Sequence, residues 1–412
     1  MKNGKSKRLG TQVPSLENSS SPREQIRQAL RRHLHAAMLG LIKDMFQQEV
    51  EALCGPRYLR QPETKAARAG SEQGSIYWDG QRQAVRRPRV RDDAGEVPLE
   101  SYQALRDYDL FSDEIQQLLI HGVSTRDFSA VTRKLDEDLP LSKSSASRAF
   151  QRSSRRDLDE LNGRDLSGES YCGIMIDGLE KAQTHVIVAL GFTSKGHKHI
   201  LGLREGATEN STVVKDLLRS LVDRGLTTTP QVLFVLDGSK ALHKAVRAQW
   251  GDRAVVQRCQ EHKIRNVRSY LPNHLQDEAE RRLRAAYGMK TYDQAATALS
   301  KLDAWLRERH EGAASSLQEG LEETLTVHKL GLPEQLRVTF RSANPIESMF
   351  DKIEYRSRRV KSWRGKNQVV RWVASSLLLH EKKFRRIKGY RQMQVLITAL
   401  ENWTVDTESK VA

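Results

Sequence analysis

Three acidic residues stand in positions where they could build a metal site. Asp177 follows an apolar run in "MIDG", and Asp237 follows a second one in "VLDG". Glu347 lies at the start of a predicted helix in "NPIES", 110 positions after Asp237. Carboxylates suit Mg²⁺, and two ions held about 3.5–4 Å apart support in-line displacement at a phosphodiester. The pattern predicts a two-metal site for Mg²⁺ or Mn²⁺.

Each of these residues also has a structural interpretation. An Asp before a Gly is common in turns and helix caps. Glu347 also fits a capping box, with Asn344 as the N-cap and the glutamate as the third helical residue. Capping explains Glu347 but not the two upstream aspartates, so the metal site is the favoured interpretation.

The apolar runs before the aspartates are typical of strands buried on both faces. "YCGIMIDG", "THVIVALGF" and "HKHILGLREG" predict a three-strand meander, and "QVLFVLDG" predicts a fourth strand. A helix in between ends at Gly225 and has one apolar face, formed by Val214, Leu217, Leu218, Leu221 and Val222. With "AVVQRC" as a further strand and two more helices, the order is β-β-β-α-β-α-β-α.

That order predicts where the first two carboxylates meet. The handedness of crossovers places the fourth strand parallel to the first and beside it. Asp177 and Asp237 then emerge at the same edge of the sheet, roughly 5–10 Å apart. Ligands of open α/β sheets bind at this carboxyl edge.

The overall charge predicts a polyanionic partner. The chain of 412 residues carries 68 Lys and Arg against 52 Asp and Glu, a net charge of +16. Nucleic acid is the usual partner of such a surface, although a large protein can simply be basic. We find no long apolar span or signal peptide, so we expect no membrane partner. Three cysteines make no disulfide framework, which favours the cytoplasm.

The N-terminal part predicts a helix followed by an extended basic segment. Apolar residues recur at helical spacing over residues 23–53, and the helix should end near Gly55-Pro56 and pack against another helix or subunit. In the run "RQAVRRPRVR", proline favours an extended, hairpin-like segment. The run either touches a phosphate backbone or is a solvated charge run.

Residues 111–165 divide into three short helical pieces, with Ser124 and Ser142 as N-caps. A short helix, a turn and a Ser/Arg-rich helix are typical of a helix-turn-helix, although many three-helix segments bind nothing. On the DNA-binding interpretation, phosphates are contacted by Arg148, Arg152, Arg155 and Arg156.

The segment after Glu347 mixes positive charge with aromatic residues. Residues 354–388 hold 12 Lys or Arg and only two Glu, with Trp363 and Trp372 among them. This mixture suits phosphate contacts and base stacking. Either tryptophan can instead be core, and "VASSLLL" after Trp372 favours core for that residue. The candidate DNA contacts are Arg356, Arg359, Lys361, Trp363 and Arg364.

Taken together, these motifs resemble the Mutator-type transposases of bacterial insertion sequences. The similarity lies in "MIDG", "LGLREGATENS", "RGL", "VLDGSKAL", "QRCQEHKIRNV" and "NPIES". The resemblance implies a DDE triad, formed by Asp177, Asp237 and Glu347, on a ribonuclease H-like fold. It also matches Cys259 and His262 to the family's Cys-x-x-His signature, accessory to the site.

Chemistry alone leaves Cys259 and His262 ambiguous. A structural zinc site needs four ligands, and no second Cys/His pair has suitable spacing. Neutral core packing at a strand end is the favoured interpretation, and His262 could instead touch DNA or the scissile phosphate.

The expected fold class is α/β, a ribonuclease H-like mixed sheet flanked by helices, interrupted by a helical insertion, with an N-terminal helical DNA-binding region. The expected segments are a flexible basic arm (1–22), a helix and irregular basic segment (23–110), a helix-turn-helix-like domain (111–165), the first catalytic part (168–271), the insertion (272–338), and the last catalytic part with basic helices (339–400).

The expected function is DNA transposition. The protein would bind double-stranded DNA at the element's terminal inverted repeats, cut one strand and join it to target DNA. Pairing of ends implies a homodimer, with the helix over 23–53 as a candidate interface, in the bacterial cytoplasm and on the nucleoid when DNA-bound. The alternatives are a nuclease that cuts without joining and a catalytically silent DNA-binding descendant.

Overall fold

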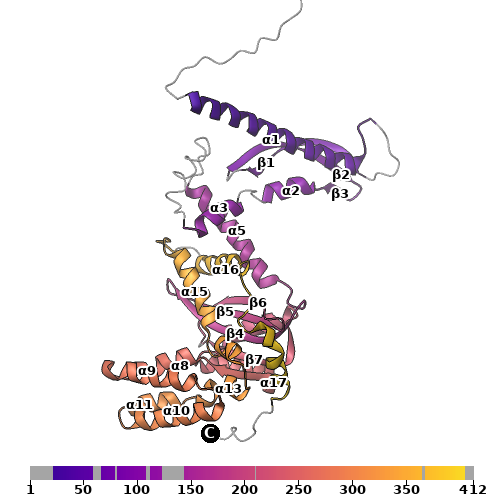
Figure 1. The fold of residues 1–412 in the computed structure, drawn as a ribbon. Coiled ribbons are helices and arrows are strands. Elements are labelled where there is room, and N and C mark those ends of the chain that lie inside the picture. The colour runs from indigo at the N-terminus through magenta and orange to yellow at the C-terminus, as the bar shows by residue number, and fades with distance from the viewer. Residues whose placement is uncertain are drawn as a thin grey trace, which may run out of the picture. The chain divides into compact units, whose positions relative to one another are not determined.

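The structure is a computed structural model that describes residues 22–58, 66–78, 81–107, 112–122, 143–208, 210–363 and 367–403. The chain forms two compact units, which are best viewed separately in Figure 1. The N-terminal unit comprises residues 1–111 and 128–145, and the C-terminal unit comprises 112–127 and 146–412. The arm predicted over residues 1–22 lies almost wholly outside the described residues.

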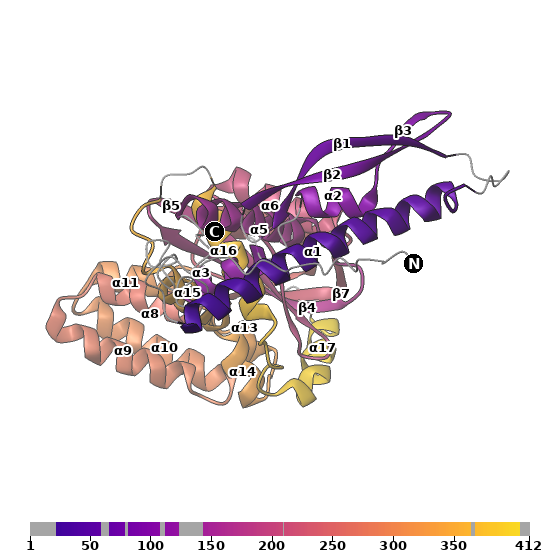
Figure 2. The ribbon, with the colours of Figure 1, turned by 90° about the horizontal axis from the view of Figure 1, so that it is seen from above.

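The N-terminal unit packs one long helix against a small antiparallel sheet (Figures 1 and 2). Its elements are α1 (Pro22–Cys54), β1 (Ala67–Trp78), β2 (Gln81–Asp92), β3 (Gly95–Val97) and α2 (Glu100–Asp107). The predicted helix is confirmed, and it ends where Gly55 takes a left-handed φ of 75°. Ile42, Phe46 and Val50 of α1 pack in one core with the sheet and with Tyr102 and Leu105 of α2, so the expected partner helix is present, together with strands that were not expected.

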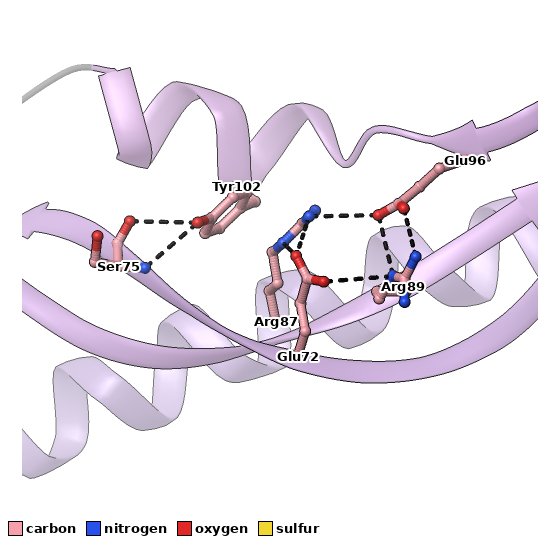
Figure 3. Close-up of polar contacts among 6 residues, drawn as sticks. All are labelled: Glu72, Ser75, Arg87, Arg89, Glu96 and Tyr102. Atoms are coloured by element: carbon pink, nitrogen blue, oxygen red, sulfur yellow. Dashed lines mark hydrogen bonds and ion pairs between the residues drawn. The ribbon is translucent and has the colours of Figure 1, made fainter.

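The arginine run lies in an antiparallel hairpin of β1 and β2, so the extended, hairpin-like segment predicted for it is confirmed, whereas the description of the wider segment as irregular was wrong. Across β1 and β2, Glu72 pairs with Arg87 in register. Arg87 also reaches Glu96 at 3.3 Å, and Arg89 binds Glu96 at 2.7 Å and Glu72 at 3.6 Å (Figure 3). The Arg87 guanidinium lies 4.8 Å from the ring centre of Tyr102. Cross-strand carboxylates thus neutralise part of the arginine run and allow it to form a strand.

The C-terminal unit is built on a five-stranded mixed sheet. The strands are β4 (Ser170–Lys181), β5 (Thr184–Thr193), β6 (Lys198–Glu205), β7 (Thr227–Leu236) and β8 (Ala254–Arg258). Their order is β6-β5-β4-β7-β8. The pairs β4–β5 and β5–β6 are antiparallel, whereas β4–β7 and β7–β8 are parallel. The predicted meander and the predicted parallel neighbour of the first strand are both confirmed.

Helices cover both faces of this sheet, which explains why its strands are continuously apolar. One core is formed with α6 (Ser211–Asp223) and α7 (Lys240–Trp250), followed by a 3-10 turn (Gly251–Arg253). The Asn210 side chain caps α6, and Val222 is 42% exposed rather than on the buried face predicted for it.

The opposite core is formed with helices from both ends of the unit. They are α5 (Lys143–Gly163), α15 (Asn344–Ser357), α16 (Gln368–Glu381) and α17 (Met393–Glu401), the last preceded by a 3-10 turn (Tyr390–Gln392). Phe150 and Trp372 stack here, with ring centres 4.6 Å apart, so the core interpretation of Trp372 is confirmed.

A separate helical group lies between β8 and α15 (Figures 1 and 2). Its core is formed by α8 (Gln260–Ser269), α9 (Asn273–Tyr287), α10 (Tyr292–Arg307) and α11 (Glu311–Gln318). The short helices α12 (Leu321–Thr324), α13 (Thr326–Lys329) and α14 (Glu334–Phe340) follow, and Val327, Leu336 and Phe340 on the last two belong instead to the sheet core that also contains α15. Ile264 and Val267 of α8 belong to its hydrophobic core. The hydrophobic core of this group therefore includes the helix that carries His262.

Only the outer helices of the proposed helix-turn-helix are described. These are α3 (Ser112–Ile120) and α5, while the middle piece, with Ser124 and Ser142, lies outside the described residues. Within the part of the chain that is described, no helix is long and apolar enough to cross a membrane.

Candidate metal centre

Strand register brings Asp177 and Asp237 together. The pairing of β4 with β7 runs up to Ile176 opposite Leu236, so the next residue on each strand is an aspartate. Neighbouring strands lie about 4.8 Å apart. Asp237 directly follows β7, as predicted, but Asp177 does not end its strand, because β4 continues along β5 as far as Lys181. The two carboxyl groups nevertheless emerge at one edge of the β4–β7 ladder.

Backbone and hydroxyl donors orient both aspartates. The N–H of Gly178 donates to Asp177 Oδ1 at 2.9 Å. The N–H of Ser239 donates to Asp237 Oδ1 at 2.8 Å, and the Thr208 hydroxyl donates to Asp237 Oδ2 at 3.1 Å. Asp237 thus has the turn-forming role considered as its structural interpretation, yet its oxygens keep further lone pairs for a cation.

Glu347 is not part of a capping box. Helix α15 begins at Asn344 with Ala343 as its N-cap, and no side chain caps the end. The glutamate instead faces α8, where the Arg265 guanidinium grips both carboxylate oxygens at 2.9 and 3.2 Å. His262 Nε2 lies 3.7 Å from Glu347 Oε1. The capping interpretation therefore fails, because the carboxylate turns toward the sheet edge rather than the helix end.

Asp177, His262 and Glu347 form one compact group. One ligand atom from each lies within 4.8 Å of the others. Asp237 is not in this group of three, but its negative charge acts on both Asp177 and His262. The structure thus assembles two of the three predicted carboxylates tightly, with the third nearby and His262 closer than expected for an accessory residue.

Within this group Glu347 is paired with Arg265, whereas the charge of Asp177 is poorly compensated. Asp177 is only 5% exposed, and burial raises its pKa to about 7, with Asp237 and Glu347 adding to the shift against the Gly178 N–H. Burial also lowers the pKa of His262, which favours the neutral imidazole. Oxygen donors with uncompensated charge are a fitting ligand set for a divalent cation. The residues present therefore fit the expected metal.

Arg265 is the residue at this site that sequence reasoning missed. It lies one helical turn after His262 on α8, in the basic stretch "EHKIRNV", and its side chain is 58% exposed. Its position three residues after the histidine was the available signal, because residues at that spacing share a helix face.

Cys259 is a core residue. It is fully buried at the N-cap of α8, and the N–H of Ala343 donates to its Sγ at 3.3 Å. Burial raises the pKa of its thiol to about 11, so the thiolate that a metal would need is disfavoured. Among the described residues, the metal-capable group does not include it. Of the Cys-x-x-His pair, Cys259 is thus buried in the core, whereas His262 lies beside the carboxylates of the candidate metal centre.

The predicted DNA contacts on α5 are spread over its outer side. Arg148 and Arg155 are exposed, while Arg152 is partly buried. Arg155 lies 3.6 Å from Asp159, and Arg156 lies 3.9 Å from Asp157.

The predicted contacts after Glu347 fall into different environments. Arg356 donates to the Ser376 carbonyl at 2.9 Å, and burial lowers its pKa, so it links α15 to α16. Arg359, which is exposed, donates to the Gly122 carbonyl at 2.7 Å, and Lys361 is exposed. Trp363 packs partly against the core, 6.2 Å from Trp372. Arg364 lies outside the described residues.

Comparison with known proteins places this chain beside transposases. It is 27% identical over 284 residues to the transposase for insertion sequence element ISRM5 of Rhizobium meliloti, covering 68% of this chain and 66% of that protein. It is also 27% identical over 212 residues to the transposase for IST2 of Acidithiobacillus ferrooxidans, covering 52% of this chain and 68% of the relative. For the transposase of IS905 from Lactococcus lactis, identity is 25% over 297 residues, with 68% and 73% covered.

The family assignment rests on a longer match. The sequence profile of the family described as "Transposase, Mutator family" matches residues 11–386. The chain belongs to the Mutator family of transposases.

Proposed function

We propose that the protein is a DDE transposase that cuts and joins DNA at the terminal inverted repeats of an insertion sequence. The observation that carries the proposal is the convergence of Asp177, Asp237 and Glu347 from two strands and a distant helix. The sheet, with three antiparallel strands followed by two parallel ones, supports a ribonuclease H-like catalytic fold. The net charge of +16 suits double-stranded DNA as the partner.

In this proposal the three carboxylates hold Mg²⁺ or Mn²⁺. When bound, the ions supply activation of the attacking oxygen and stabilisation of the leaving oxygen. Asp177 would bind the ion as the carboxylate, without its proton, because ligation needs the ionised form. Asp237 is held in place by Thr208 and Ser239, and Glu347 would have to give up its contact with Arg265 to bind a cation.

The reaction has two balanced steps. Water attacks the phosphodiester that joins the element to flanking DNA, the P–O bond to the element's terminal 3′ oxygen breaks, the phosphate stays on the flanking strand, and the element end is left with a 3′-hydroxyl. That hydroxyl then attacks a phosphodiester of target DNA, forming one P–O bond as another breaks. Neither step needs a covalent bond to the protein, because water and then the DNA hydroxyl are the nucleophiles.

Pairing of two element ends requires at least a dimer. Helix α1 is the proposed interface, since Leu41 and Met45 on it are 65% and 48% exposed. Light scattering of the purified protein, with Leu41→Ser and Met45→Ser variants, tests this assignment. A wild type that stays monomeric with paired ends would contradict it.

The central experiment offers a labelled element-end duplex and a target plasmid to the protein with Mg²⁺. Wild type should yield joined products, whereas Asp237→Asn should not. Asp223→Asn, which changes an exposed aspartate on α6, is the matched control and should join normally. Cleavage without joining would support a nuclease, and binding without either reaction would support a silent DNA-binding descendant.

A further inference from the structure

A groove runs between the end of α3 and the outer side of α15 within the C-terminal unit. Its volume is about 520 Å³. It is formed mainly by His121, Gly122, Lys352, Tyr355, Arg358 and Arg359. Arg359 ties its two walls together by donating to the Gly122 carbonyl at 2.7 Å. The groove therefore lies between two helices that are distant in sequence, and this hydrogen bond joins them.

The charge of the groove is positive and unpaired. Lys352, Arg358 and Arg359 line it, against one carboxylate, that of Asp351. Among the described residues, none of these three cations forms an ion pair within 4 Å. Most arginines on α9 and α10, by comparison, have carboxylate partners. Unpaired cations that share one groove fit an anionic ligand.

An exposed aromatic ring stands in the same groove. Tyr355 is 60% exposed, and the Arg358 guanidinium lies 4.0 Å from its ring centre. The cation–π contact holds the ring in place while leaving most of it open. A ring that is exposed yet fixed is suited to stacking, because little side-chain freedom remains to be lost on binding.

Helix α15 connects this groove to the candidate metal centre. Glu347 and Arg358 are 11 residues apart, which is about three helical turns, so they lie on the same side of α15. Their separation along the axis is about 16 Å, and Tyr355 lies about 12 Å from Glu347. At the rise of about 3.4 Å per nucleotide of a stacked strand, these distances correspond to at most about four or five nucleotides, and a more extended unpaired strand would need fewer.

We infer that this groove binds an unpaired stretch of DNA strand adjoining the reacting phosphodiester, with one base stacked on Tyr355. The inference rests on the proposed function and adds the form of its substrate. Base faces are hidden in an intact duplex, whereas an unpaired strand offers both a base face for Tyr355 and phosphates for Lys352 and Arg359. A duplex would engage the cations but leave the ring without a partner.

The test compares two DNA probes on protein that carries Asp237→Asn, without added metal, so that no strand is cut. One probe is a blunt 30-base-pair duplex, and the other is the same duplex with a four-nucleotide unpaired tail containing 2-aminopurine. Mixed sequence suffices, because stacking is tolerant of sequence. Affinity is read by anisotropy and stacking by quenching of the 2-aminopurine fluorescence.

Tyr355→Leu should weaken binding of the tailed probe by about 5- to 100-fold and abolish the quenching, with blunt duplex binding changed less than twofold. Tyr355→Phe should behave as the parent, because it keeps the ring. Tyr270→Leu, which changes another exposed tyrosine outside the groove, is the matched control. If Tyr355→Leu folds poorly, Arg358→Gln supplies a second test. This variant should reduce the quenching, and it should lower the number of ions released on binding, read from the salt dependence of the affinity, by about one.

Equal effects of Tyr355→Leu on both probes, or no effect on either, would overturn the inference. Tighter parental binding of the blunt probe would assign the groove to duplex DNA instead. These readouts do not need catalysis. Loss of joining by wild-type protein with intact tail binding would thus count against the proposed function and not against the groove.

Discussion

Two groups of charged side chains in this protein are arranged in opposite ways. In the hairpin of the N-terminal unit, Glu72 and Glu96 share two guanidinium groups, those of Arg87 and Arg89 (Figure 3). Every member of this group has an oppositely charged neighbour. In the C-terminal unit, three carboxylates converge, and the described side chains bring only Arg265 into direct ion-pair contact with one of them, Glu347.

The pKa values express the same difference. The Arg89 guanidinium lowers the pKa of Glu96, so the ionised form of that carboxylate is stabilised. Burial raises the pKa of Asp177 to about 7, so its charge is costly in the protein without metal. A balanced group supports the local fold, whereas an unbalanced, desolvated one costs stability and favours a cation from outside. Charge balance therefore distinguishes the paired cluster of the hairpin from the candidate metal centre.

The largest expected effect comes from removing the charge of Asp177. Asp177→Asn should reduce strand transfer by at least about 10²- to 10³-fold, since a carboxylate ligand is lost. The same change should raise the Tm of the metal-free protein, because it removes a buried, repelled charge. Joining assays and calorimetry on one preparation check both.

The corresponding change in the balanced group is the control. Glu72→Gln should leave strand transfer within twofold and should lower the Tm rather than raise it. If Asp177→Asn lowered the metal-free Tm as Glu72→Gln does, the distinction between the two groups would be lost.

The next effect is on the pH dependence of stability without metal. The pKa of Asp177 is about 7 in the folded protein against 3.8 for an ordinary aspartate, so the folded state keeps a proton that the unfolded state releases. Stability should therefore fall as pH rises from about 4 to 7, by up to roughly 4 kcal/mol for a three-unit shift. Denaturant unfolding at several pH values measures this slope.

Comparing the wild type with a variant isolates the contribution of Asp177 to the pH dependence of stability. Asp177→Asn should flatten the slope between pH 4 and 7, and saturating Mg²⁺ should do the same in the wild type by favouring the ionised carboxylate. An identical slope in the wild type and the variant would show that Asp177 ionises normally.

A smaller effect is expected from Arg265. Arg265→Gln removes the cation that grips Glu347, and because the side chain is 58% exposed, we expect Mg²⁺ to bind only about two- to fivefold more tightly. Titration calorimetry on the metal-free protein measures it. Arg268→Gln, on the same helix but paired with Glu280, is the matched control and should leave Mg²⁺ affinity unchanged. Weaker Mg²⁺ binding in Arg265→Gln would mean that the arginine positions Glu347 for the metal.

The smallest effect is expected in the hairpin. Glu96→Gln should lower the Tm of the N-terminal unit by about 1–2 °C at low salt and less at 1 M salt, because exposed pairs are screened. Its response to Mg²⁺ should equal that of the wild type. Thermal scans at two salt concentrations test this, and a change in Mg²⁺ affinity would show that the hairpin group is not merely structural.

Local sequence patterns determined most of the C-terminal unit. Strands buried on both faces appear as continuous apolar runs, and the handedness of crossovers then fixes β7 as the parallel neighbour of β4. These two facts suffice to bring Asp177 and Asp237 together. The helix α1 and the core position of Trp372 could also be predicted, the first from apolar spacing and the second from the apolar run after the tryptophan. The spacing did not identify the buried face of α1, because Leu41 and Met45 are exposed whereas Ile42 and Phe46 are buried.

Tertiary structure alone decided what each polar side chain meets. The extended conformation of the arginine run could be predicted, but its partners Glu72 and Glu96 could not, and Arg356 turned inward to Ser376 while Arg359 stayed exposed. Glu347 does not form the capping box that its position suggested but pairs with Arg265, 82 positions away in the chain. Hydrophobic burial follows a local pattern that the sequence displays, but the partner of a charge depends on which distant segment packs beside it, and only the folded chain specifies that.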